Sequence, residues 1–170
     1  MTSRTIEGEE PALASGPGPA VAASLDELVA TVREAASAYI GGDARRYFDL
    51  VRTTEGSTLM SPFGGDTVRD DGAPVTEARI AELEAFFQGG ECTLEVVDAM
   101  TSGDLAVLVL VEHQHGTVGP ARPQDWSLRV TLVFRMVDGG WRLAHRHADA
   151  LVHPITFDQL AALARGSGAD

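Results

Sequence analysis

The clearest indication of the architecture is the stretch WSLRVTLVFRMVDGGWRLAHRHA, which spans Trp126 to Ala148. Apolar and polar residues alternate in both halves of it, as they do in strands that bury one face. Asp138-Gly139-Gly140 separates the halves, and Asp and Gly readily adopt the positive φ angles that tight hairpin turns need. The stretch therefore predicts a β-hairpin with strands at Trp126–Val137 and Trp141–Ala148.

Two more strands of the same pattern precede this hairpin. They are predicted at Cys92–Met100 and Leu105–His115, and Ser102-Gly103-Asp104 between them is again typical of a tight turn. The connection Gly116–Asp125 is longer and contains two prolines. The four strands together predict an antiparallel meander.

Before Glu91 the apolar residues recur at helical spacing instead. Ser24 and Glu27 have the spacing of a capping box, which predicts the start of a first helix that Gly41-Gly42 ends. Asp43 and Thr76 are predicted to cap a second and a third helix. The remaining expectations are an end of the third helix at Gly89-Gly90, a short strand near Thr58–Met60 and a last helix at Phe157–Ala164.

Three helices followed by a twisted meander sheet define an α+β fold, with the helices packed on one face of a curved antiparallel sheet. Residues 24–165 are expected to form this single domain. Residues 1–23 mix Gly, Pro, Ala and acidic residues without periodicity and are expected to be a disordered tail, and 166–170 a short C-terminal tail.

The composition excludes several classes of partner. Lys and Arg total 13 against 25 for Asp and Glu, so the formal net charge of −12 disfavours binding to nucleic acid or to an anionic membrane surface. No apolar run reaches the roughly 18–20 residues that cross a bilayer. The N-terminus lacks the pattern of a signal peptide, which predicts a cytoplasmic protein, and the single cysteine, Cys92, cannot form an internal disulfide.

Short turns would also set the register of the sheet, with Asp149 opposite Leu128 and Leu128 opposite His113. One face would then be apolar at one end and polar at the other, and we assign it to the helix-covered side, as a hydrophobic pocket with a polar mouth. That face carries Leu105, Val107, Val109, Val111, His113, His115, Trp126, Leu128, Val130, Leu132, Phe134, Met136, Trp141, Leu143, His145, His147 and Asp149.

The opposite face mixes charged and apolar residues, which suits a subunit interface. The sequence thus predicts a homodimer through the outer face of the sheet. The residues assigned to it are Arg129, Arg135, Arg142, Arg146, Glu112, Ala106, Leu108, Leu110, Val133, Ala144 and Ala148.

The ending Gly139 to Asp149, GGWRLAHRHAD, resembles the last strand of SnoaL-like proteins in the nuclear transport factor 2-like superfamily. It is also similar to the end of the association domain of calcium/calmodulin-dependent kinases. Gly42-Asp43, Ser61-Pro62 and Ala85-Phe86-Phe87 support the resemblance, which covers about Leu25 to Asp149. It implies a cystatin-like cone with a pocket beneath the sheet.

That superfamily includes steroid isomerases, polyketide cyclases, dehydratases, epoxide hydrolases and non-catalytic assembly domains. Steroid isomerases use a Tyr and two Asp residues, and the matching positions here are Ala35, Ser61 and Leu132. Since all three lack the required groups, that mechanism is not expected. No Asp-Arg-Asp cluster of the epoxide hydrolase type can be placed in the cone either.

The histidines are the main candidates for chemistry. The pairs His113/His115 and His145/His147 could each offer metal ligands, but an intervening strand separates them by roughly 9–10 Å. We therefore expect no metal site and no cofactor. Histidine titrates near neutral pH, so His147 and His145 with Asp149 are the predicted acid–base group.

Two functions remain open. One is a cofactor-free cyclase, dehydratase or isomerase acting on a small hydrophobic organic molecule through this His/Asp group. The other is a non-catalytic ligand-binding or oligomerisation module. In either case the predicted ligand contacts are Trp126, Tyr39, Phe86, Phe87, His113 and Ser61.

Overall fold

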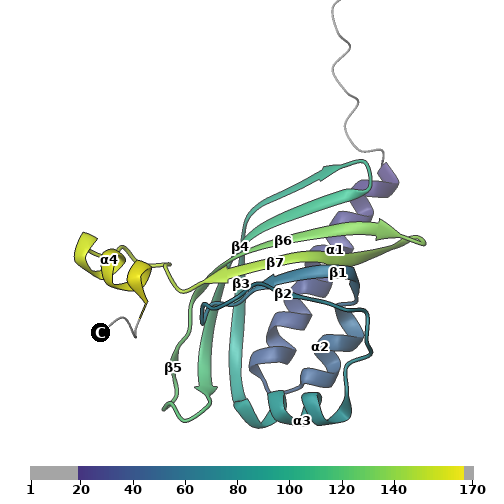
Figure 1. Cartoon of the computed structure of the whole chain (residues 1–170). Coiled ribbons are helices and arrows are strands. Elements are labelled where there is room, and N and C mark those ends of the chain that lie inside the picture. Colours follow the sequence, from purple (N-terminus) through teal and green to yellow (C-terminus); the bar gives the residue numbers. More distant parts are fainter. Residues whose placement is uncertain (1–18, 167–170) are drawn as a thin grey trace, which may run out of the picture.

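The computed structural model describes residues 19–166 and has the predicted α+β architecture (Figure 1). The four strands of the meander are confirmed, with slightly wider bounds at most ends. In chain order the elements are α1 (Pro19–Ile40), α2 (Ala44–Leu50), β1 (Thr53–Met60), β2 (Val68–Arg69), α3 (Glu77–Phe86), β3 (Phe87–Ser102), β4 (Leu105–Val118), β5 (Gln124–Asp125), β6 (Leu128–Val137), β7 (Gly140–Asp149) and α4 (Phe157–Arg165).

The sheet is a meander with one parallel addition. Its order is β2-β1-β7-β6-β4-β3, in which β3, β4, β6 and β7 are antiparallel neighbours and β5 pairs with β4. Strand β1 joins β7 in parallel, which the hairpin pattern did not predict. The turn between β6 and β7 has φ angles of 50° at Asp138 and 77° at Gly139, as expected of a tight hairpin turn.

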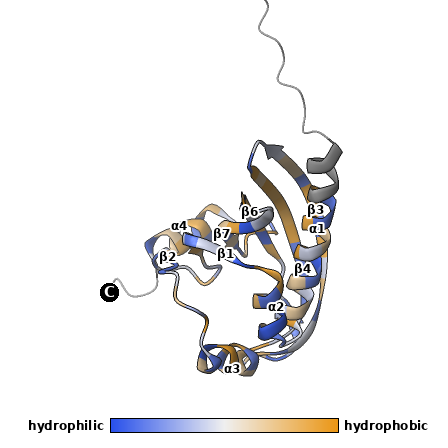
Figure 2. Cartoon of the chain, turned by 90° about the vertical axis from the view of Figure 1, so that its right-hand side faces the viewer, coloured by the Kyte–Doolittle hydropathy of each residue, from blue (hydrophilic) through white to orange (hydrophobic). Residues whose placement is uncertain are grey.

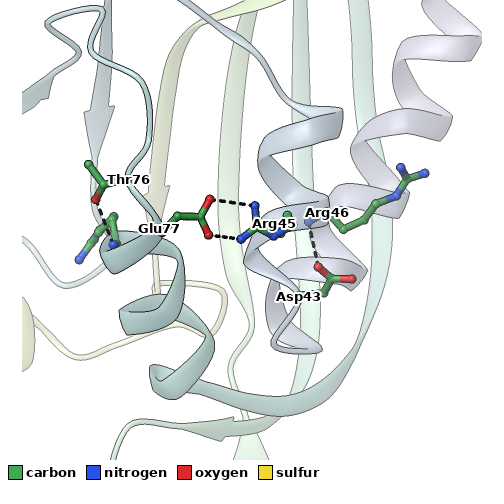
Figure 3. A network of polar contacts seen from close by, with 6 residues as sticks. Asp43, Arg45, Arg46, Thr76 and Glu77 are labelled. Carbon is green, nitrogen blue, oxygen red and sulfur yellow. Dashed lines mark hydrogen bonds and ion pairs between the residues drawn. The ribbon is translucent and has the colours of Figure 1, made fainter.

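The predicted helix caps of α2 and α3 are confirmed. The Asp43 side chain accepts a hydrogen bond from the Arg46 backbone N–H, and the Thr76 hydroxyl accepts one from that of Arg79. Figure 3 shows how the two helices are tied together, since Glu77 at the start of α3 receives two hydrogen bonds from Arg45 of α2. This end of the fold is therefore fixed by polar contacts between neighbouring helices.

Two predicted helix ends are wrong. Helix α1 begins at Pro19, before the Ser24–Glu27 pattern, and α3 ends at Phe86. Gly89 and Gly90 belong to β3, where a Cβ on Gly90 would lie 2.5 Å from the His115 carbonyl oxygen. Their small size permits a close approach of two strands. Of the tails expected at 1–23 and 166–170, residues 1–18 and 167–170 lie outside the described residues, while residues 19–23 belong to α1.

The core lies between α1 and the concave face of the sheet. Leu28, Val32 and Ala35 of α1 pack in one buried cluster with residues of β4 and β6. Figure 2 shows α1 running along the curved β3 and β4, with α2 beside it and α3 at its end. The sheet residues of this cluster include Ala106, Leu108, Leu110, Val130, Leu132 and Phe134.

The predicted assignment of faces is wrong for β4 and for the second half of β7. Leu128 pairs with Glu112 rather than His113, so the even-numbered residues of β4 face the core. In β7, Leu143 pairs with Phe134 but His145 pairs with Val133, and the extra residue Ala144 forms a β-bulge. Each one-residue shift exchanges the two faces. As a result Ala106, Leu108, Leu110, Glu112, Arg146 and Ala148 face inward, whereas Val107, Val109, Val111, His113, His115, His145, His147 and Asp149 lie on the outer face.

Helix α4 confirms the predicted C-terminal helix and stands apart from the rest of the fold in Figure 1. Thr156 and Gln159 form its capping box. Phe157, Leu160 and Leu163 are all exposed on it. Within the described part of the chain, no helix combines the length and the apolar character needed to span a bilayer.

Candidate functional site

A cavity of about 640 Å³ lies between the helices and the concave face of the sheet. Such a volume is within the range of about 300–1,000 Å³ found for small-molecule sites. The walls are mainly apolar, and they come from every layer of the fold. Helix α1 contributes Val32, Ala35 and Ala36, and the sheet contributes Leu132 and Phe134.

A polar cluster interrupts this apolar lining at the Glu112 end of β4. Glu112 is only 5% exposed, and its Oε2 accepts a hydrogen bond of 2.8 Å from Nε2 of Gln114. Arg146 of β7 reaches the same Oε2 with its Nη2 at 3.3 Å. All three residues line the cavity. The ion pair between Glu112 and Arg146 is largely shielded from water, which strengthens the attraction between its charges.

The second oxygen of Glu112, Oε1, accepts no hydrogen bond from a described residue, since Gln114 and Arg146 both bind Oε2. Among the described residues, no fully buried side-chain oxygen or nitrogen is without a partner. Oε1 is therefore not fully buried, and Glu112 is one of the residues that line the cavity.

Two tyrosines line the cavity beside this cluster. Burial raises the pKa of Tyr39 to about 12, and burial likewise raises the pKa of Tyr47. The charge of Arg146 lowers both pKa values and that of Glu112 raises both, so the two hydroxyls lie within electrostatic reach of the ion pair. Both phenols are neutral hydrogen-bond donors at neutral pH.

The predicted ligand contacts divide into two groups. Tyr39, Ser61, Phe87 and Trp126 line the cavity. Phe86 is absent from its lining and instead packs edge-on against Phe63, which lines the cavity and is 67% exposed. Four of the six predicted ligand contacts are therefore at the cavity, and their contact with a ligand stays a prediction.

The predicted acid–base group lies elsewhere. His145, His147, Asp149 and His113 are on the outer face and do not line the cavity. Asp149 holds Arg129 through hydrogen bonds of 2.9 and 3.0 Å. Burial raises the pKa of Asp149, but the hydrogen bonds from Arg129 and from the Leu151 backbone outweigh it and hold that pKa below its usual value.

Three of the histidines have polar partners of their own on that face. His113 Nε2 lies 3.1 Å from Glu95 Oε2, and His115 Nδ1 lies 2.8 Å from Asp125 Oδ1. His145 Nδ1 is 2.7 Å from the Thr58 hydroxyl. Among residues 19–166 there is no group of three or more His, Cys, Asp or Glu side chains arranged to hold a metal ion.

Sequence reasoning missed Glu112, Gln114 and Arg146 as site residues. Both faces of β4 are apolar before Glu112, so the alternation in that part of the strand does not distinguish inside from outside. The available signal was the pair Glu112 and Gln114, two polar residues on the same face as Leu108 and Leu110. The positions matched to the steroid isomerase groups, Ala35, Ser61 and Leu132, do line the cavity and carry no ionisable side chain.

Comparisons with known proteins agree with this architecture. A sequence model described as a SnoaL-like domain matches residues 28–152. No curated protein sequence matches the chain.

Several solved structures share the fold at low sequence identity. One is from Streptomyces avermitilis, a candidate dehydratase of the nuclear transport factor 2-like family, with a TM-score of 0.59, 18% identity and coverage of 80% of this chain and 100% of that one. A cystatin-like domain of unknown function from Nostoc punctiforme has a TM-score of 0.58, 15% identity and coverage of 84% and 85%. A cystatin-like protein from Caulobacter vibrioides has a TM-score of 0.57, 17% identity and coverage of 82% and 93%.

Proposed function

The chain belongs to the SnoaL-like domain family, and from this premise we propose that its cavity binds a small, mainly hydrophobic organic molecule. The observation that carries the proposal is an apolar cavity of about 640 Å³ into which a few polar groups converge. Apolar walls supply affinity through burial, and a small number of polar groups fixes the orientation of a ligand.

The chemistry that this site supports is proton transfer without a cofactor. Glu112 offers an acceptor oxygen, while Arg146, Tyr39 and Tyr47 offer donors in a largely apolar space. His145, His147 and Asp149 do not line this cavity, so we propose that the reaction takes place at Glu112. The candidate dehydratase from Streptomyces avermitilis supports the fold alone.

A direct test uses the bicyclic hydrocarbon tetralin and its ketone 2-tetralone as probes. Ala35 lines the cavity and is 1% exposed, so Ala35→Phe projects a ring into the space that the ligand needs. Ala30→Phe makes the same change at an exposed position of α1 and is the matched control. We expect saturable binding of both probes to the wild type and the control, and binding weakened by about tenfold or more in Ala35→Phe.

The proposal fails if neither probe binds the wild type, or if Ala35→Phe binds them as well as Ala30→Phe does. Thermal unfolding of each variant shows whether it is folded during the titration. A folded Ala35→Phe protein with unchanged affinity would place the ligand outside this cavity.

We also propose that two copies associate through the outer face of the sheet. Val107, Val109 and Val111 of β4 form an apolar strip there, beside Val133 of β6. Arg129 and Arg135 on β6 and Arg142 on β7 border the strip. An apolar centre with a charged border is the composition of protein interfaces.

The oligomeric state tests this second proposal independently of ligand binding. Val109→Lys puts a charge in the middle of the strip, whereas Val68→Lys makes the same change on the exposed strand β2. Light scattering during size-exclusion chromatography is expected to show dimers for the wild type and for Val68→Lys, and monomers for Val109→Lys. A monomeric wild type would refute the dimer and leave the cavity proposal untouched.

A further inference from the structure

We propose that helix α4 is the lid of the cavity and that it folds over the mouth when a ligand is bound. In this closed position its apolar stripe, formed by Phe157, Leu160 and Leu163, completes the wall of the binding site. The inference rests on the proposed function, because a bound ligand is what favours the closed position. It adds the part of the chain that shields the ligand from water.

The first argument is that the described part of the fold leaves the apolar stripe of α4 exposed. Phe157 is 80% exposed, Leu160 48% and Leu163 62%, and Figure 1 shows the helix apart from the rest of the fold. The three side chains recur every three residues and lie along one side of the helix, while Asp158 and Arg165 lie on the other. A helix of nine residues is marginal in water by itself, so α4 gains stability from an apolar surface that accepts the stripe.

The second argument is that the mouth of the cavity is itself apolar and exposed. Phe63 and Val75 line the cavity and yet are 67% and 43% exposed, so they form part of its rim. Leu59 also lines the cavity and is 38% exposed. Pro62 and Pro74, next to Phe63 and Val75 in the chain, line it as well. A helix that covers this rim removes apolar area of both surfaces from water.

The third argument is the linker between β7 and α4, which begins at the cavity. Ala150 follows β7 directly and lines the cavity. The six residues 151–156 span up to about 20 Å when extended, enough for α4 to reach the rim from Ala150. Among the described residues, one hydrogen bond ties this linker to the body, from the Leu151 N–H to Asp149 Oδ1. The helix can therefore move as a unit about Ala150 while its capping box stays intact.

The same linker decides which cavity α4 covers. A short flexible linker gives the helix an effective concentration on the order of millimolar at the rim to which it is joined. A second copy of the chain competes only at the concentration of the protein. The lid therefore belongs to the cavity of its own chain.

Cross-linking tests the position of α4. Phe63→Cys with Leu160→Cys places one thiol on the rim and one in the stripe, and Phe63→Cys with Ala162→Cys is the matched control, because Ala162 is exposed on the polar side of α4. With tetralin bound, a short bismaleimide is expected to join the first pair within one chain at least about tenfold faster than the control pair. Cys92 does not interfere, because burial raises the pKa of its thiol to about 12.

The contribution of the stripe to binding is measured with polar substitutions. We expect Leu160→Gln combined with Leu163→Gln to weaken the binding of tetralin by about tenfold, mainly through faster dissociation, and Ala162→Gln to leave it within about twofold of wild type. All three positions are exposed, so the fold is retained in both variants.

Cross-links that join two chains instead of one would assign α4 to the cavity of a second copy and overturn the proposal. Equal rates for the two cysteine pairs would overturn it too. So would unchanged affinity in the double glutamine variant while the wild type binds tetralin, and both of these results leave the proposed function intact. A wild type that binds neither tetralin nor 2-tetralone refutes the proposed function, and closure on a ligand with it.

Discussion

Arg146 and Glu112 come from strands β7 and β4, which are separated by β6, and yet their side chains meet at 3.3 Å on the concave face. The carboxylate is 7% exposed and the guanidinium 19%. Neither charge could be held in this position without the other, because an unpaired buried charge loses its hydration without compensation.

Removing the cation alone should be costly. We expect Arg146→Met to lower the free energy of unfolding by about 3–5 kcal/mol, since it leaves Glu112 buried beside Gln114 with no counter-ion. The double variant Glu112→Leu with Arg146→Met should be clearly more stable than Arg146→Met alone. Urea denaturation of the wild type and the two variants measures both effects, and a cost below about 1 kcal/mol for Arg146→Met would contradict a shielded pair.

The tyrosines give a spectroscopic test of the cavity environment. The chain contains two, Tyr39 and Tyr47, and burial raises the pKa of both. A group whose folded pKa is raised stabilises the fold below its unfolded pKa of about 10, and that stabilisation is lost as the pH rises toward the folded value. Ultraviolet titration should show little tyrosinate at pH 11 until the protein unfolds, whereas a midpoint near pH 10 in folded protein would indicate solvated phenols.

Cys92 should be unreactive in the folded protein. Burial, followed by the charge of Glu112, raises the pKa of its thiol to about 12. Because the thiolate is the nucleophile, alkylation by iodoacetamide at pH 8 is expected to be about 100-fold slower in native protein than in urea. Equal rates in the two conditions would mean that the inner face of β3 is open to solvent.

The outer-face histidines should not affect the cavity. His147 is exposed and pairs with Thr131 across the sheet, away from the cavity lining. We expect His147→Asn to leave the affinity for 2-tetralone within about twofold of wild type. A clear loss of affinity in this variant, with the fold retained, would show that the ligand contacts the outer face.

Helix caps and tight turns were predictable from the sequence, because a few neighbouring residues decide each of them. Asp43 and Thr76 cap their helices, and Asp138-Gly139 forms its turn, because each depends on hydrogen bonds or φ angles within a few positions. Tyr39 and Phe87 were assigned to the cavity correctly, since both lie where α1 and α3 meet the sheet.

The faces of the sheet were not predictable by the same means. Their assignment depends on long-range register, and one bulge at Ala144 places Leu143 inside and His145 outside. The run from Leu105 to Val111 is apolar at every position, so this run contains no sign of which face is the inner one. This is why the base was sought at His147 and why Glu112 and Arg146 were assigned to a subunit interface.

The central claim is most directly tested by a crystal structure of the protein with 2-tetralone. We predict density for the ligand inside the cavity, in contact with Ala35 and Leu132, with its carbonyl oxygen toward Arg146. A cavity filled by its own side chains, or a ligand bound on the outer face beside His147, would contradict the account.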